Sequence, residues 1–117
     1  RMSGSRGSPY VERCRDYIAK HIFEKLSVAE IAGALGVHQS YLSRLFAAET
    51  GTAISRYILQ EKIHVSCNLI KYSGQSIAAI ADYVSLSPQS YFSRVFKRVM
   101  NRTPAQYRKE NQSKKFL

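Results

Sequence analysis

The chain has 117 residues, of which 44% are hydrophobic, and it carries a formal net charge of +10 at pH 7. That length accommodates one domain, or two very small domains that share a helix. The charge predicts a polyanionic partner, and no apolar segment approaches the roughly 20 residues that a membrane-spanning helix needs, so we expect no membrane partner.

The positive charge is concentrated towards the C-terminus. Residues 1–70 hold nine basic and six acidic side chains, a net +3, whereas residues 71–117 hold nine and two, a net +7. From Tyr83 through Lys109 no residue is acidic. An acid-free run of this length favours nucleic acid as the partner over an ordinary solvated surface.

The side chains that commonly take part in catalysis or metal binding are not spaced as in known catalytic or metal-binding motifs. Cys14 and Cys67 lie far apart without a Cys-x-x-Cys motif, which fits a reducing cytoplasm and small core residues. His21, His38 and His64 lack the spacing of metal ligands. The sequence has no glycine-rich phosphate loop and no spacing that indicates paired carboxylates or a Ser/His/Asp set. We therefore predict no enzyme, no cofactor and no metal.

The first subdomain is expected over residues 9–53. Residues 1–8 are rich in Gly and Ser, and we exclude them from the fold as a tag or linker. Pro9 opens a helix over residues 10–24, in which apolar residues recur every three or four positions.

A helix, a tight turn and a second helix follow. Ser27 is a good N-cap, Glu30 occupies the capping-box position, and a short helix runs over residues 28–35. Gly36 supplies the positive φ of a sharp turn before a helix over residues 39–50. This is the helix-turn-helix pattern. The outer face of the second helix carries Gln39, Ser40, Ser43 and Arg44.

A linker helix is predicted over residues 54–72. At about 1.5 Å per residue it would span roughly 27 Å, enough to hold two subdomains about one DNA turn apart. Ser73, Gly74 and Gln75 form its stop signal.

The second subdomain, residues 73–111, repeats the arrangement. Ser76 caps a short helix, and Ser87 caps a second helix that Pro88 opens. The outer face of this helix carries Gln89, Ser90, Ser93 and Arg94.

The end of the chain is predicted as one more helix. Asn101 ends the preceding helix in a left-handed conformation, and Pro104 starts the last one, which reaches about residue 111. Residues 112–117 look like a fraying basic tail.

The two subdomains form an internal repeat. Residues 27–32 align with residues 76–81, and residues 40–46 align with residues 90–96 after a one-residue insertion. Apolar positions vary between the copies, but the exposed Ser, Ser and Arg are identical. A purely structural duplication has no reason to retain exposed polar side chains, so we expect two DNA-reading helices.

The chain resembles the AraC/XylS family of bacterial transcription regulators over about residues 10–109. The first subdomain carries part of the resemblance at residues 41–46 and 49–52. The second carries the C-terminal signature of the family, which here reads Ser76–Ile77–Ala78–Ala79–Ile80–Ala81, Ser90–Tyr91–Phe92–Ser93–Arg94–Val95–Phe96–Lys97 and Thr103–Pro104–Ala105–Gln106–Tyr107–Arg108.

The resemblance implies an all-α fold of seven helices, with two helix-turn-helix subdomains joined by a long helix. It implies a cytoplasmic protein whose two recognition helices enter adjacent major-groove segments of double-stranded DNA. Many members of the family are activators that contact RNA polymerase. Many also carry an N-terminal ligand-sensing or dimerising domain, for which we find no counterpart in these residues.

The sequence departs from the family pattern at two turns. Where the family usually has Gly-Phe, this chain has Ser85 and Leu86, and where it usually has Gly after the recognition helix, this chain has Asn101. We expect Ser85 to accept the turn geometry at some strain.

The resemblance assigns base contacts to the eight outer-face residues named above. Arg can donate to guanine O6 and N7, and Gln can pair with adenine, which makes Arg44 and Arg94 the strongest candidates. Both arginines could instead contact phosphates or remain solvated. Long basic side chains and helix starts suit phosphate contacts, although each basic side chain could equally be an ordinary surface residue. The phosphate candidates are Lys25, Ser27, Arg56, Ser76, Lys97, Arg98 and Arg102.

Two alternatives remain at this stage. A helical protein-interaction module could use the basic face to bind an acidic partner. An enzyme that transfers an alkyl group to Cys14 or Cys67 would need an accessible thiol, whereas both cysteines lie in apolar helical registers.

Overall fold

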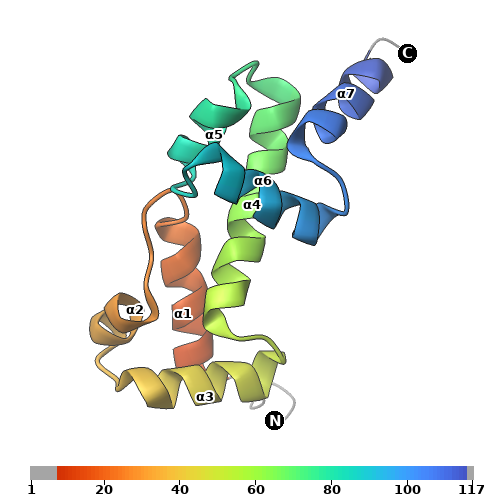
Figure 1. Cartoon of the computed structure of the whole chain (residues 1–117). Helices are drawn as coiled ribbons and strands as arrows, with labels where there is room; N and C mark the ends of the chain where they lie inside the picture. The colour runs from red at the N-terminus through yellow and green to blue at the C-terminus, as the bar shows by residue number, and fades with distance from the viewer. Residues whose placement is uncertain (1–7, 116–117) are drawn as a thin grey trace. The chain divides into compact units, whose positions relative to one another are not determined.

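The computed structural model describes residues 8–115, with side chains through residue 112. All regular secondary structure in this range is helical, which confirms the all-α class. Figure 1 shows the order of the helices. They are α1 (Pro9–Lys20), α2 (Val28–Leu35), α3 (Gln39–Thr50), α4 (Ile54–Tyr72), α5 (Ile77–Tyr83), α6 (Gln89–Met100) and α7 (Pro104–Lys115).

The chain divides into two compact units, and the division falls inside α4. Unit 1 ends at Leu59 and unit 2 begins at Gln60. The helix predicted over residues 54–72 is α4, with the same bounds. Its first turns belong to unit 1 and its remaining turns to unit 2.

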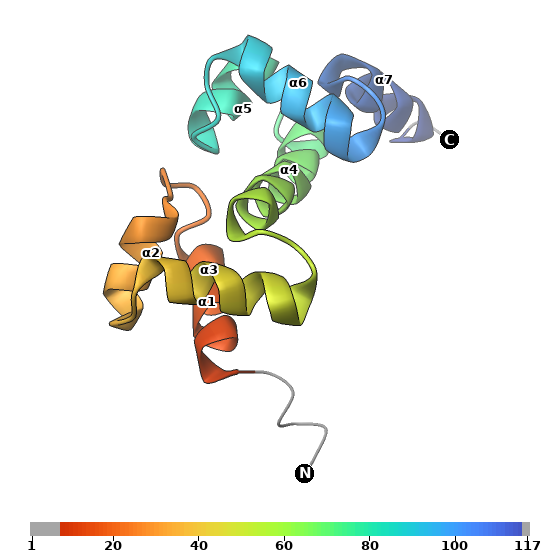
Figure 2. The same cartoon turned by 60° about the horizontal axis from the view of Figure 1, so that its bottom comes forward.

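Unit 1 is built around apolar side chains from α1, α2 and α3. Ile18, Ile31, Leu42 and Phe46 are almost completely buried, and α1 packs against both α2 and α3. Figure 2 shows the short turn that joins α2 to α3. Gly36 makes this turn possible because its φ of 73° lies in the left-handed region.

Unit 2 has the same construction. The core holds Ile63, Ile80, Phe92 and Phe96, and α6 packs against α5 and α7. The Tyr107 ring meets Phe96 edge-on, with ring centroids 5.6 Å apart. This core keeps one face of α6 buried and leaves the other face exposed.

Three expected helix boundaries differ in the structure. The first helix ends at Lys20 instead of residue 24, because His21 leaves helical geometry with φ −114° and ψ 26°. Pro88, not Ser87, is the N-cap of α6, because its backbone is extended with ψ 171°. The last helix reaches Lys115 instead of residue 111, since Asn111 does not end it and its side chain donates to the Tyr107 carbonyl.

Both departures from the family pattern occupy left-handed backbone conformations. Ser85 has φ 59° and Asn101 has φ 63°, as the sequence analysis expected for turns that usually contain glycine. Asn tolerates this region better than Ser, so more strain is expected at Ser85.

A pair of substitutions at Ser85 measures this strain. We expect Ser85→Gly to be more stable than Ser85→Ala by about 1 kcal/mol, because only Ala retains a Cβ that opposes positive φ. Both variants lose the hydroxyl, so their difference isolates the backbone. Equal free energies of unfolding in urea would contradict the strain.

The two cysteines are buried and free, as expected for core residues. Burial raises the pKa of the Cys14 thiol from its ordinary value of 9.0 to about 11. Burial also raises the pKa of Cys67. Neither thiol is therefore disposed to act as a nucleophile near neutral pH.

The raised Cys14 pKa predicts a loss of stability at alkaline pH. Below about pH 9 the thiol is neutral in the folded and unfolded chains, so its contribution is fully present. As the pH rises from about 9 to about 11, the unfolded chain releases this proton first, and the folded state loses stability. We expect the stability of Cys14→Ala to fall less steeply across this window than that of the parent, as measured by urea unfolding. Parallel curves would contradict the assignment.

Candidate nucleic-acid interface

Helix α3 presents the polar face predicted for unit 1. Gln39, Ser40 and Arg44 are exposed and Ser43 is half-buried, because Leu42 on the same helix is fully buried in the core. The Arg44 Nε donates to the Ser40 carbonyl over a long 3.4 Å. The His38 Nδ1 lies 3.0 Å from the Ser40 hydroxyl, so the start of this face is ordered by a side-chain contact.

A shallow hollow lies on the surface of α3. Tyr41, Arg44 and Leu45 line it, and its volume is about 230 Å³. The Tyr41 ring is 44% exposed and meets the Tyr10 ring of α1 edge-on, with centroids 6.2 Å apart. The aromatic ring next to Arg44 is therefore already packed against another helix.

Helix α6 presents the corresponding face in unit 2. Gln89, Ser90 and Arg94 are exposed and Ser93 is half-buried. The Arg94 guanidinium carbon lies 5.6 Å from the centroid of the Tyr91 ring, within the range of a cation–π contact. In each unit, the structure thus brings the four predicted base-reading residues onto one helix.

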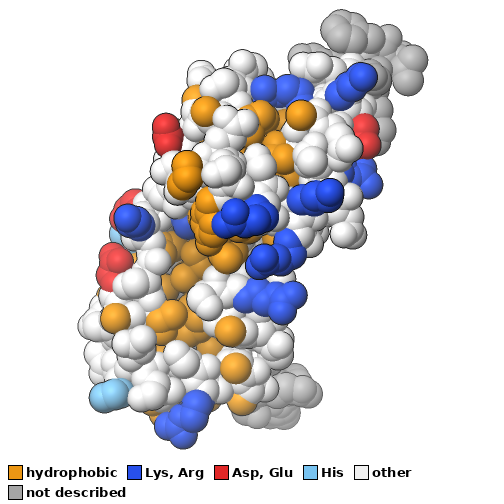
Figure 3. Space-filling view, in the orientation of Figure 1, with side chains coloured by type: hydrophobic (Ala, Val, Ile, Leu, Met, Phe, Trp, Pro, Cys, Tyr) orange, Lys and Arg blue, Asp and Glu red, His pale blue; other side chains and the backbone are white. Residues whose placement is uncertain are grey.

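The basic side chains of these helices remain available to a ligand. Within residues 8–112, the ion pairs are His21–Glu24, His64–Glu61 and Arg102–Glu110. None of them includes Arg44, Arg94 or Lys97, so among the described side chains these cations are not neutralised by an acid. Figure 3 shows Lys and Arg side chains gathered over α6.

The residues predicted to contact phosphate are all exposed, but they differ in the partners that their side chains already have. Arg102 Nη1 lies 2.7 Å from Glu110 Oε1, so part of its charge is already compensated. The Ser27 and Ser76 hydroxyls accept hydrogen bonds from the backbone N–H groups of Glu30 and Ala79, which confirms both caps. Among the described residues, the ion pairs include none of the other candidates, which are Lys25, Arg56, Lys97 and Arg98.

One buried lysine, Lys62, supports this candidate interface and was not predicted from the sequence. Lys62 is only 2% exposed, and its Nζ donates to the Val84 carbonyl at 2.8 Å. Val84 is the C-cap of α5 and immediately precedes Ser85, so the ammonium group anchors the turn that leads to α6. The signal was present in the sequence, since Lys62 lies four residues after the buried Ile58 and shares its side of α4.

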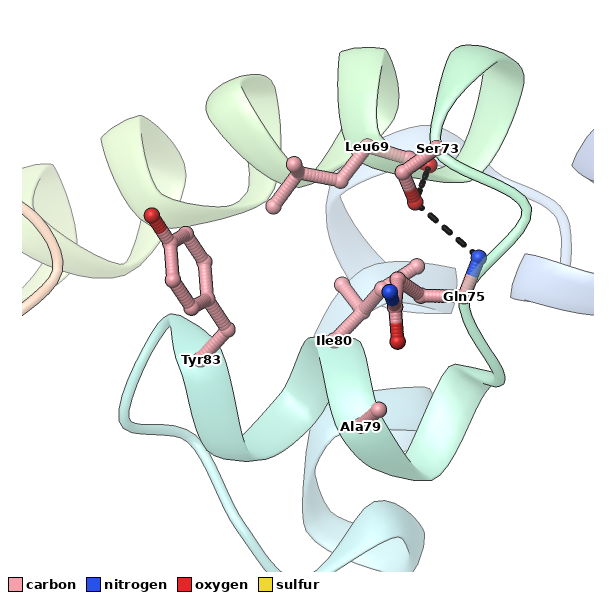
Figure 4. Close-up of a pocket in the computed structure, with 6 residues that line it drawn as sticks. All are labelled: Leu69, Ser73, Gln75, Ala79, Ile80 and Tyr83. Carbon is pink, nitrogen blue, oxygen red and sulfur yellow. Dashed lines mark hydrogen bonds between the residues drawn. The ribbon is translucent and has the colours of Figure 1, made fainter.

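A second surface feature of unit 2 lies between α4 and α5 (Figure 4). This mainly apolar pocket has a volume of about 350 Å³ and contains none of the predicted DNA-contacting residues. The Ser73 hydroxyl closes one end, since it donates to the Leu69 carbonyl and accepts from the Gln75 N–H. The lining residues are Leu69, Ser73, Gln75, Ala79, Ile80 and Tyr83.

The described residues carry neither a metal cluster nor a membrane span. They contain no group of three or more His, Cys, Asp or Glu side chains placed to hold a metal ion. None of their helices is both long enough and apolar enough to cross a membrane.

Comparison with known proteins assigns the family. A family model described as a helix-turn-helix domain matches residues 31–110. A solved regulator from Chromobacterium violaceum, described as containing an AraC-type DNA-binding domain, is 28% identical with a TM-score of 0.84, over 93% of this chain and 96% of that one. The chain belongs to the AraC-type helix-turn-helix family. It is therefore a DNA-binding domain of the kind found in transcription regulators and not an enzyme.

Two further similar proteins agree with this assignment. The C-terminal domain of AraT, a response regulator from Geobacillus stearothermophilus, is 34% identical with a TM-score of 0.84, over 88% of this chain and 86% of that one. The Msm operon regulatory protein of Streptococcus mutans is 33% identical over 95% of this chain. The chain spans only 40% of the length of that relative.

Proposed function

We propose that this AraC-type domain binds double-stranded DNA sequence-specifically and that α3 and α6 enter adjacent segments of the major groove. The observation that carries the proposal is the duplicated outer face. Each recognition helix exposes Gln, Ser and Arg at matching positions, and a buried apolar side holds it in place. Those side chains can hydrogen-bond to base edges.

The proposed contacts divide between bases and phosphates. Arg44 and Arg94 would each donate two hydrogen bonds to a guanine, and Gln39 and Gln89 would pair with adenines. The serines are short and suit water-mediated contacts. Phosphate contacts would fix the register, because Lys and Arg neutralise phosphate charge without reading the sequence. We assign them to Lys25, Arg56, Lys97 and Arg98, to the helix starts at Ser27 and Ser76, and to Arg102 once it releases Glu110.

We further propose that the domain works in the cytoplasm as the effector of a transcription activator that contacts RNA polymerase. The support is the relatives, which are bacterial regulators considerably longer than this chain. The remaining length of the regulator would supply a ligand-sensing or dimerising domain. Activation of a reporter gene by the full-length regulator, and its loss on deletion of this domain, would test this role.

Selection of bound duplexes from a random pool tests the proposed DNA binding directly. We expect one enriched sequence with two conserved segments, and an affinity for it that falls steeply with salt. A scrambled duplex should bind more weakly at every salt concentration. If no duplex binds at low salt, the proposal fails, and the result favours a helical module that binds an acidic protein partner.

A further inference from the structure

The two recognition helices carry the same arginine in different surroundings. Arg94 lies over the Tyr91 ring, with its guanidinium carbon 5.6 Å from the ring centroid. Among the described residues no cation–π contact joins the equivalent pair, Tyr41 and Arg44. The Tyr41 ring packs edge-on against Tyr10. The polar contact of the Arg44 side chain within the described part of the chain is the long hydrogen bond to its own helix.

A guanidinium that lies over an aromatic ring loses little orientational entropy when it binds a base. The group is planar and weakly hydrated, so it stacks on a ring at small desolvation cost. To contact guanine it must present two N–H groups in one plane to O6 and N7. Restricting its orientation beforehand reduces the entropy lost on binding, whereas a phosphate contact has no comparable requirement for orientation.

We propose that Tyr91 positions the Arg94 guanidinium for a guanine of the target, and that Tyr41 has no such role towards Arg44. This inference rests on the proposed function, in which Arg94 reads a base. The two helices therefore differ in specificity although their outer faces match. The arginine of α6 is oriented by an aromatic ring before DNA arrives, whereas the arginine of α3 is held only by a long hydrogen bond to its own helix.

A double-mutant cycle between Tyr91 and Arg94 tests the inference. The affinities of the parent, Tyr91→Leu, Arg94→Ala and the double variant are measured for the selected duplex and for a scrambled duplex. We expect Tyr91→Leu to weaken target binding by about two- to fivefold, which corresponds to an exposed cation–π contact. The scrambled duplex should change by less than about twofold. In the Arg94→Ala background the effect of Tyr91→Leu on the target should disappear.

The chain supplies a matched control in its first unit. The same cycle with Tyr41→Leu and Arg44→Ala should be close to additive, because among the described residues no cation–π contact joins that pair. Tyr91→Phe separates the ring from its hydroxyl and should bind the target as the parent does. Three results together support the inference: coupling in the Tyr91–Arg94 cycle, additivity in the Tyr41–Arg44 cycle, and a target affinity of Tyr91→Phe equal to that of the parent.

The remaining outcomes overturn this inference and separate its failure from a failure of the proposed function. If Arg94→Ala keeps the preference for the target, Arg94 reads no base, and the inference fails together with the base contact assigned to Arg94, whereas sequence-specific binding stands. The proposed function fails only if the parent shows no preference for any duplex. If Arg94→Ala loses the preference but Tyr91→Leu costs the same in both backgrounds, only the positioning role fails. It also fails if Tyr91→Phe is as weak as Tyr91→Leu, because the hydroxyl would then make the contact, or if the Tyr41–Arg44 cycle shows equal coupling. Matching thermal unfolding midpoints establish that each variant is folded.

Discussion

Arg94→Ala is expected to weaken binding to the selected duplex by about 1–3 kcal/mol and to relax the preference at one base pair. The substitution removes two donors to a guanine but leaves the buried side of α6 intact, since Arg94 is exposed and the core positions Phe92 and Phe96 are unchanged. The measurement is the affinity for the target duplex and for duplexes in which the base pair assigned to Arg94 is replaced by each of the other base pairs.

Lys97→Ala is the control on the same helix. Lys97 is exposed and lies outside the four base-reading positions, so its loss should weaken all duplexes similarly and reduce the salt slope by about one. If Arg94→Ala behaved in the same way, its contact would be with a phosphate. If it bound target and scrambled DNA as the parent does, it would make no functional contact.

Arg44→Ala extends the comparison to the first unit. It should relax the preference at a different base pair, in the segment assigned to α3. We expect unit 2 to depend more on phosphate attraction, because residues 71–117 carry a net +7 against +3 for residues 1–70. Equal changes in salt slope for Arg44→Ala and Arg94→Ala would contradict this difference.

Lys62→Met is expected to destabilise unit 2 by about 1–3 kcal/mol, because the Val84 carbonyl would be left buried without its charged donor. Methionine keeps a stem of similar length, so the packing around position 62 is largely retained while the ammonium group is removed. The free energy of unfolding in urea measures the effect. Target affinity should fall as well, since the Val84 carbonyl is part of the turn that leads to α6.

Two control variants test whether the stability lost in Lys62→Met comes from the hydrogen bond of the buried ammonium group. Lys97→Met changes an exposed lysine of the same unit and should stay within about 0.5 kcal/mol of the parent. Lys62→Arg retains a cationic donor and should recover part of the lost stability. If Lys62→Met were as stable as the parent, the buried ammonium would contribute nothing net, as happens for some buried charges that apolar residues can replace.

Helix boundaries were best predicted where the signal was local. The bounds of α2, α3 and α4 match the expected ones, because Ser27, Gly36 and Gly51 act within a few residues of the helix ends they define. The first and last helices differed because no strong cap marks where they end. The N-cap of α6 was misassigned by one residue, since both Ser and Pro suit the start of a helix.

Part of the candidate site could also be predicted from local sequence patterns. The repeat and the apolar periodicity of α3 and α6 placed Gln, Ser and Arg on an outer face, and the structure exposes Arg44 and Arg94 there. Ser43 and Ser93 were expected to point away from the core, yet both are half-buried. Periodicity gives the direction of a side chain but not how far its neighbours cover it.

The sequence by itself determined the all-α class, the duplicated helix-turn-helix pattern and the family, because these depend on spacing along one chain. Only the tertiary structure decided which side chains already contact other residues of the protein. The Lys62–Val84 hydrogen bond, the Tyr10–Tyr41 contact and the Arg102–Glu110 ion pair each join different helices or residues more than one helical turn apart. Such contacts depend on how helices pack, which sequence spacing does not specify. The Tyr10–Tyr41 contact is the one that bears on the recognition helices, since it engages the ring next to Arg44, whereas the Tyr91 ring lies under Arg94.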